Sequence, residues 1–257
     1  MYIPTYGRPR LDHYLEFLAR KAIIASIIPL NRKAYFSKIS ELPEIKGPAL
    51  VAGSAPEPTI PRGADNSWFR ISVNASQAVF SAFGFGEPNL TIFQPKIKFE
   101  DEGRQAYWQV LKGRGTGHLI FSVNRRNDGR IEEFLKSKDF HAAKITYLSE
   151  RFKNAIVREV AKQTLITPYR YERSVSNGLF SVFLALRLGA NPVVMTGFSF
   201  SDGWFHSKEV AARRNHQWID RYACQRFVEL GLPVYTSERE FSAATGLPLW
   251  KGNPRSL

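Results

Sequence analysis

The chain has 257 residues, of which 44% are hydrophobic and 23% charged, a composition that is typical of folded proteins and excludes an intrinsically disordered one. This length fits one α/β domain, alone or with a small appendage. The formal net charge of +13 favours anionic partners such as nucleotides, nucleic acid, acidic glycans or an anionic membrane surface. A simple excess of solvated Lys and Arg is the alternative explanation.

The amino-terminal part of the chain is basic and then apolar. Basic residues between Arg8 and Lys21 precede the apolar run Ala22–Leu30, which is too short to span a bilayer and contains Pro29. No signal peptide is evident, so we expect a cytoplasmic protein. A basic amphipathic segment can lie on an anionic membrane, which would place the protein peripherally at the inner membrane. The general rule that amphipathic helices face a core favours ordinary packing instead.

The single cysteine, Cys224, excludes an intrachain disulfide and a cysteine-rich zinc site. It lies in a helical pattern, where we interpret it as a small core residue rather than a nucleophile.

Short apolar runs alternate with helical patterns along the chain, which predicts a Rossmann-like α/β fold with a mostly parallel sheet and helices on both faces. Gly189 and Gly231 follow two of the helices, where a left-handed C-cap favours glycine. The expected strands are Ala49–Gly53, Phe69–Val73, Leu90–Phe93, His118–Val123, Ile145–Leu148, Val193–Gly197 and Val234–Thr236. The expected helices are Asp12–Ser26, Arg130–Lys136, Arg151–Gln163, Asn177–Leu188 and Lys208–Leu230.

Small polar residues stand where several of these strands end. Gly53 and Ser54 follow the first strand, Asn74 follows the second, and Ser122 and Asn124 close the fourth. Ligands of parallel sheets bind beyond the carboxyl ends of the strands, so these positions are candidates for a binding site. Glycine allows close approach of a ligand, and an amide can read both donors and acceptors. Ordinary turns, including an Asx-turn at Asn74, are the alternative.

The segment Tyr169–Gly178 precedes a buried helix. Ser176 can cap that helix, and the N–H groups of its first turn, around Asn177 and Gly178, would face an anion. Tyr169 and Tyr171 can donate their hydroxyl groups to a phosphate. A capped helix with exposed tyrosines is the alternative.

Two histidines compete for a catalytic role. His216 lies near the start of a helical pattern with Asp220 one turn later, where a carboxylate can orient an imidazole. His206 lies in an aromatic loop. No histidine and carboxylate spacing indicates a metal site, and no Gly-x-Ser-x-Gly motif indicates a serine triad.

Taken in order, these segments resemble the bacterial sialyltransferases of glycosyltransferase family 42. The resemblance covers roughly residues 49–236, and its specificity lies in the order and spacing of the motifs. Val51–Pro56 resembles the family's A-G-N-G-P-S turn, and Phe69–Asn74 its F-R-x-N segment. Further similar segments are Phe93–Pro95 (aromatic-x-N-P), Ser122–Asn124 (C-S-N), Arg173–Gly178 (R-I-T-S-G), Val194–Phe200 (L-S-G-I-D-F) and His216–Asp220 (H-S-x-x-x-D).

The resemblance implies a sialyltransferase-like variant of a GT-A-type fold with a small lid, and a metal-independent, inverting transfer of sialic acid from CMP-sialic acid. It implies His216 as the general base and Tyr169 and Tyr171 as groups that assist the leaving phosphate. The positions that it assigns to the nucleotide are Gly53, Ser54, Asn74, Ser122, Asn124, Ser176, Asn177 and Gly178.

The sequence departs from the family pattern at several of these positions. Ser54 stands where the family has asparagine, and Asn177 where it has serine. The spacing of the two tyrosines is shorter, and His216 needs a shift of one residue to align. These changes affect the expected identity of the donor sugar more than the expected fold. A related CMP-activated acid sugar such as Kdo is the alternative to sialic acid.

The expected organisation is an N-terminal basic, amphipathic segment (1–47), a catalytic domain that binds the nucleotide sugar (48–240) with a lid near 201–215, and a C-terminal tail (241–257). The expected partners are a CMP-sugar donor and a glycan or glycolipid acceptor, with no cofactor and no metal. The alternatives are a Mg²⁺-dependent nucleotide diphosphokinase or transferase on a similar sheet, and a basic nucleic-acid-binding module. For the latter no RRM, KH or helix-turn-helix signature is found.

Overall fold

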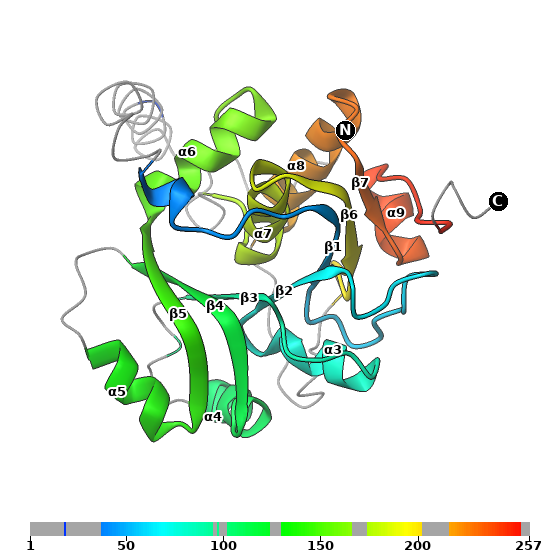
Figure 1. Ribbon diagram of the computed structural model, residues 1–257. Coiled ribbons are helices and arrows are strands. Elements are labelled where there is room, and N and C mark those ends of the chain that lie inside the picture. The colour runs from blue at the N-terminus through cyan, green and yellow to red at the C-terminus, as the bar shows by residue number, and fades with distance from the viewer. Residues whose placement is uncertain are drawn as a thin grey trace.

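A computed structural model describes residues 18, 37–94, 97, 102–123, 130–165, 174–201 and 216–252 (Figure 1). These residues contain a seven-stranded sheet in which every pairing is parallel. The strands are β1 (Gly47–Ala52), β2 (Phe69–Val73), β3 (Leu90–Phe93), β4 (Arg114–Val123), β5 (Phe140–Ser149), β6 (Ala190–Thr196) and β7 (Val234–Thr236).

The strand order is β5-β4-β3-β2-β1-β6-β7. From β1 the chain adds strands in one direction as far as β5, and it then returns to place β6 and β7 on the other side of β1. The order therefore reverses between β1 and β6. Open parallel sheets bind ligands at such a switch point, beyond the carboxyl ends of its strands.

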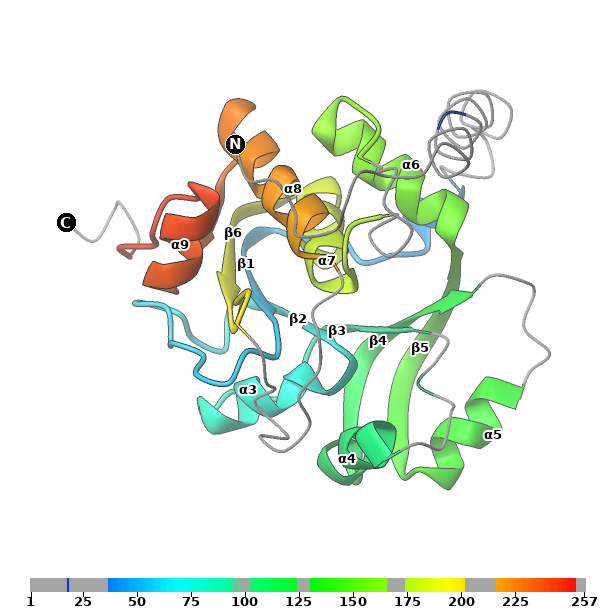
Figure 2. The same cartoon turned by 180° about the vertical axis from the view of Figure 1, so that it is seen from behind.

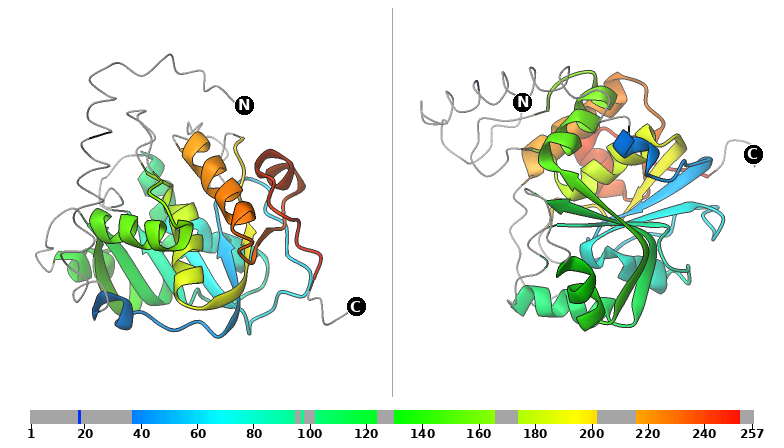
Figure 3. Two further views of the ribbon diagram at one scale, coloured as in Figure 1. Left: turned by 90° about the horizontal axis from the view of Figure 1, so that it is seen from above. Right: turned by 60° about the vertical axis from the view of Figure 1, so that its left-hand side comes forward.

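Helices cover both faces of the sheet, which makes three layers (Figures 1 and 2). The view from above and the rotated view in Figure 3 show α6, α7 and α8 together on one face, and α3, α4 and α5 on the other. The helices are α3 (Gln77–Ala82), α4 (Glu102–Leu111), α5 (Arg130–Ser137), α6 (Glu150–Ala161), α7 (Asn177–Arg187), α8 (Gln217–Glu229) and α9 (Arg239–Thr245), with a 3₁₀ turn η1 (Asn74–Ser76).

The central strands are apolar on both faces because both faces are covered. In β1, Ala49 and Val51 belong to the core beneath α6, α7 and α8, whereas Leu50 and Ala52 belong to the core beneath α3. Helix α7 is also buried over most of its length, as its nearly uniform apolar sequence predicts. These observations confirm the predicted fold class.

All seven predicted strands are present, and β2, β3 and β7 have the predicted bounds. Gly189 and Gly231 have φ of 102° and 61°, which confirms the predicted left-handed positions after α7 and α8. Cys224 is fully buried in the core, as predicted, and burial raises the pKa of its thiol well above the usual range.

The sequence analysis missed three helices: α3, α4 and α9. Helix α3 has six residues and follows directly on η1, too short a segment for a periodic pattern to be distinctive. Helix α9 lies across the expected boundary at residue 240, and its Phe241 is buried in the core with Leu247.

The predicted helix Asp12–Ser26 lies outside the described residues except for Leu18, and so does most of the predicted lid. The division of the chain into three segments stays a prediction.

None of the helices formed by the described residues is both long and apolar enough to cross a membrane.

Candidate functional site

The candidate site lies at the carboxyl edge of the sheet around β1 and β6. Helix α7 leads into β6, and α8 leads into β7, so both helices run antiparallel to the strands and begin at this edge. Their first turns carry Ser176, Asn177, Gly178 and His216. The fold therefore brings these predicted residues to the same edge as Gly53.

Gly53 makes a close contact with β6. A Cβ atom on Gly53 would lie 2.3 Å from the carbonyl oxygen of Gly197, and one on Gly197 would lie 2.8 Å from that of Gly53. The N–H groups of Gly53 and Ala55 donate to the carbonyl oxygens of Thr196 and Gly197, both at 2.8 Å. Glycine is thus required here for strand-to-strand approach, and these two N–H groups are already used within the fold.

The ring of Phe198 links this junction to α7. A Cβ atom on Gly53 would lie 3.1 Å from its Cδ2, and one on Gly178 would lie 2.9 Å from its Cε1. The ring is itself buried and packs against Phe241. Gly53 and Gly178, which are 125 residues apart in the sequence, therefore contact the same side chain.

Glu238 holds the turn after β1 against β6 and β7. Its Oε1 accepts hydrogen bonds from the N–H groups of Gly197 at 2.7 Å and Thr59 at 3.2 Å, and its Oε2 accepts one from the Thr236 hydroxyl at 3.0 Å. Burial raises the pKa of this carboxyl, and the hydrogen bonds from Gly197 and Thr59 oppose the shift. Sequence reasoning missed Glu238 because its partners come from three separate segments.

Ser176 is the N-cap of α7, as predicted: its Oγ accepts a hydrogen bond from the Leu179 N–H at 3.2 Å. Its own N–H donates to Oδ1 of Asp220 at 2.8 Å. Asp220 was interpreted as the residue that orients His216. The structure shows that its carboxylate binds the turn before α7, and so ties α8 to α7.

His216 is the N-cap residue of α8, and its Nδ1 lies 2.9 Å from the carbonyl oxygen of Ser174. A carbonyl oxygen only accepts, so this contact requires the proton on Nδ1. In this tautomer of the neutral imidazole, Nε2 carries the free lone pair. Nε2 is therefore the atom that can accept a proton if His216 acts as a general base. The backbone carbonyl of Ser174 therefore orients the imidazole.

Lys153, on α6, reaches the first turn of α7 from inside the protein. Its side chain is 6% exposed, and its Nζ donates to Oδ1 of Asn177 at 2.9 Å. Burial lowers the pKa of this ammonium group, and the nearby carboxylates of Glu150 and Asp220 oppose the shift. No sequence pattern indicated this contact, because Lys153 and Asn177 are 24 residues apart and lie on different helices.

Asn74 has a left-handed φ of 51°, and its Oδ1 accepts a hydrogen bond from the Gln94 N–H at 3.3 Å. It thus joins the ends of β2 and β3. Ser76 joins β1 and β2, since its Oγ donates to the Ala52 carbonyl oxygen and accepts from the Val73 N–H. The next residue, Gln77, is 2% exposed, and its buried Oε1 has no hydrogen-bond partner. Sequence reasoning singled out neither Ser76 nor Gln77.

The remaining predicted residues lie in the turn after β1, in β4, or outside the described residues. Ser54 is half-buried in the turn after β1. Ser122 is buried in β4, which lies three strands from β1, or about 14 Å at the usual strand spacing. Asn124, Tyr169, Tyr171 and His206 lie outside the described residues.

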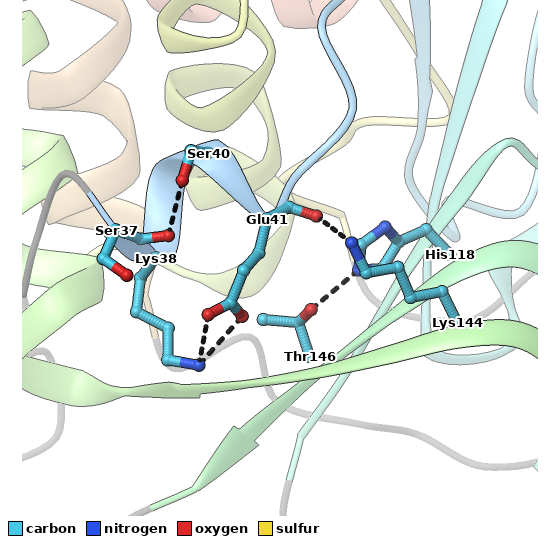
Figure 4. Close-up of polar contacts among 7 residues, drawn as sticks. All are labelled: Ser37, Lys38, Ser40, Glu41, His118, Lys144 and Thr146. Atoms are coloured by element: carbon cyan, nitrogen blue, oxygen red, sulfur yellow. Dashed lines mark hydrogen bonds and ion pairs between the residues drawn. The ribbon is translucent and has the colours of Figure 1, made fainter.

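A second polar cluster lies away from this edge (Figure 4). His118 of β4 is buried, and its Nε2 lies 2.9 Å from the Thr146 hydroxyl of β5. Lys144 donates to the backbone carbonyl of Glu41, in the turn that follows the short helical segment 37–40. Burial lowers the pKa of His118, with a smaller contribution from Lys144. The cluster fastens this segment to the sheet.

Among the described residues, no group of three or more His, Cys, Asp or Glu side chains is placed to hold a metal ion.

Fold and site together define a parallel α/β protein with a polar, glycine-lined junction at its topological switch point. No protein-family model matches the sequence, and no match is found among curated proteins. The monofunctional α-2,3-sialyltransferase Cst-I from Campylobacter jejuni has a similar structure, with a TM-score of 0.50 and 12% identity over 80% of each chain.

The sialyltransferase CST-II in complex with a trisaccharide acceptor and CMP has a TM-score of 0.48 at 13% identity, over 81% of this chain and 89% of that chain. CstII from Campylobacter jejuni in complex with CMP-3FNeuAc has a TM-score of 0.47 at 13% identity, over 80% of this chain and 86% of that chain. The likeness to Cst-I shows that the chain has a sialyltransferase-like fold, as the order of the sequence motifs predicts.

Proposed function

We propose that this protein is a glycosyltransferase that moves sialic acid, or a related acid sugar such as Kdo, from a CMP-activated donor to a glycan or glycolipid acceptor. The observation that carries the proposal is that Gly53 and Gly178 meet at the ring of Phe198, at the sheet edge where α8 begins with His216, in a sialyltransferase-like fold. These residues lie in the same order along the chain as the motifs of glycosyltransferase family 42.

The first turn of α7 suits the donor phosphate. The N–H groups at the start of a helix have no acceptor within the helix, and the helix dipole adds positive potential there. Gly178 lies in this turn, and the space left by its missing side chain holds the ring of Phe198, which packs the turn against the end of β6. Anions bind at such ends without a metal.

In the proposed reaction, Nε2 of His216 removes the proton from the acceptor hydroxyl as that oxygen attacks the anomeric carbon. The bond from the anomeric carbon to the phosphate oxygen breaks, and CMP leaves with the bonding electron pair. Attack from the face opposite the leaving group inverts the anomeric configuration. Tyr169 and Tyr171 are proposed to donate hydrogen bonds to the departing phosphate.

Activity is expected to survive chelation. With CMP-sialic acid or CMP-Kdo as donor, CMP release should proceed at the same rate with and without EDTA, because protein donors at α7 replace a metal ion at the phosphate. A coupled assay of CMP release measures this. Complete loss with EDTA, restored by Mg²⁺, would contradict the proposal and favour a Mg²⁺-dependent nucleotide transferase.

A further inference from the structure

Among the residues that the structure describes, Lys153 is the most deeply buried charged side chain near the candidate site. Its Nζ lies 2.9 Å from Oδ1 of Asn177, 3.8 Å from Oε1 of Glu150 and 5.5 Å from the centre of the Phe180 ring. Removing an ammonium group from water costs several kcal/mol unless it is well paired. The Glu150 side chain is 45% exposed, so it offers only a partly screened charge. The contact with Asn177 is the shortest polar contact of this lysine, and the buried carboxylate of Asp220 adds a favourable charge.

This contact fixes which way the Asn177 amide faces. An ammonium group has only donors, so the carbonyl oxygen of the amide must face Lys153. The NH₂ group then occupies the other branch of the amide, away from the buried lysine. Asn177 is half-buried whereas Lys153 is almost wholly buried, so the accessible part of the amide is the donor part.

We propose that Lys153 is a positioning residue, which holds Asn177 so that its NH₂ group donates to an anionic oxygen of the bound donor at the first turn of α7. The inference rests on the proposed function, since it needs a CMP-sugar at this edge. The amide would add a side-chain donor to the backbone N–H groups of the same turn, and hydrogen bonds to charged acceptors are the stronger kind. Two anions of the donor fit this chemistry: the phosphate of CMP and the carboxylate of the acid sugar.

The matched variant is Asn177→Asp, which keeps the shape of the side chain and its pairing with Lys153. It replaces the NH₂ group by a carboxylate oxygen, so a donor becomes an acceptor with negative charge. The affinity for the anion that Asn177 binds should fall on the order of 100-fold, the usual worth of a hydrogen bond to a charged group together with the added repulsion. The affinity for cytidine, which carries neither anion, should not change.

Isothermal titration of the full-length protein with cytidine, CMP and CMP-sialic acid separates the two anions. A loss for both CMP and CMP-sialic acid assigns Asn177 to the phosphate. A loss for CMP-sialic acid alone assigns it to the carboxylate. Unchanged affinity for both ligands, or an equal loss for cytidine, would overturn the inference.

Lys153→Met tests whether the lysine acts through Asn177. Methionine keeps the packing on Phe180 but removes the donor, so the amide can turn over, and the affinity for the same ligands should fall about tenfold. In an Asn177→Ala background the further change Lys153→Met should have no effect on these affinities. An undiminished effect there would show that Lys153 acts by another route, and would contradict its positioning role.

Lys138→Met is the matched control, because Lys138 also lies over a phenylalanine ring, with its Nζ 5.7 Å from the centre of Phe134 at the end of α5. It should leave all three affinities unchanged. Cytidine binding also reports that each variant is folded. If the wild-type protein bound none of the three ligands, the proposed function would fail, and this inference with it. If the wild type bound and only the variants failed to differ, this inference alone would fail.

Discussion

Replacing His216 by alanine is expected to lower turnover by roughly two to four orders of magnitude, the usual contribution of a positioned general base. The affinity for CMP should change little, because in the proposed mechanism the imidazole acts on the acceptor hydroxyl and not on the nucleotide. A general base acts in its unprotonated form, so the wild-type rate should fall towards acid pH, and the variant should lack this dependence. CMP release from the sugar donor, measured from pH 5 to 9, gives both results.

His216→Asn separates the chemistry from the geometry. The amide nitrogen of asparagine can take the place of Nδ1 and donate to the carbonyl oxygen of Ser174, and asparagine is a good N-cap for α8. The variant should therefore fold normally and still lose turnover as alanine does. His206→Ala is the second control, and it should remain active. If His206→Ala were crippling while His216→Ala stayed active, the assignment of the base would be wrong.

Gly53→Ala is expected to destabilise the protein by about 3 kcal/mol, at the upper end for overpacking a tight site. The new Cβ would lie 2.3 Å from the carbonyl oxygen of Gly197, a backbone atom held by the pairing of β1 with β6. For a chain of this size such a loss lowers the melting temperature by roughly 10 °C. Thermal unfolding followed by circular dichroism measures the shift.

Gly86→Ala is the control for this substitution. Gly86 is exposed, and the nearest atom to its new Cβ would be Nη2 of Arg70 at 3.7 Å, an ordinary contact. Its melting temperature should stay within about 2 °C of the wild type, as is usual for surface changes. A Gly53→Ala protein as stable as the wild type would show that β1 and β6 do not approach as closely as described.

The strands could be predicted because burial on both faces leaves continuous apolar runs, such as Ala49–Ala52, that need no knowledge of their neighbours. The candidate site could be predicted only in part. The cap at Ser176 follows from local sequence, since its partner Leu179 is three residues away. The contacts of Lys153 and Asp220 with the same turn join residues 24 and 44 positions apart, and local patterns carry no information on such pairs.

The sequence analysis singled out Gly53, but the structure gives a different physical reason why glycine is needed at this position. The sequence analysis interpreted this glycine as an opening for a ligand, whereas its missing side chain makes room for the backbone of Gly197. Which strand would lie beside β1 depends on the reversal of strand order, and β6 begins more than 130 residues later. The site is therefore built as much by packing between distant segments as by the motifs themselves.

Nucleotide selectivity tests the central claim most directly. In a thermal-shift panel at equal concentrations, CMP and CDP should raise the melting temperature more than UDP, GDP or ADP. A ligand at 100 times its Kd adds about 2.7 kcal/mol of stability, which corresponds to several degrees. A selective shift with cytidine nucleotides is the result that the account predicts. Equal shifts with all five nucleotides would indicate only attraction by the net charge of +13, and would contradict a cytidine-specific donor site.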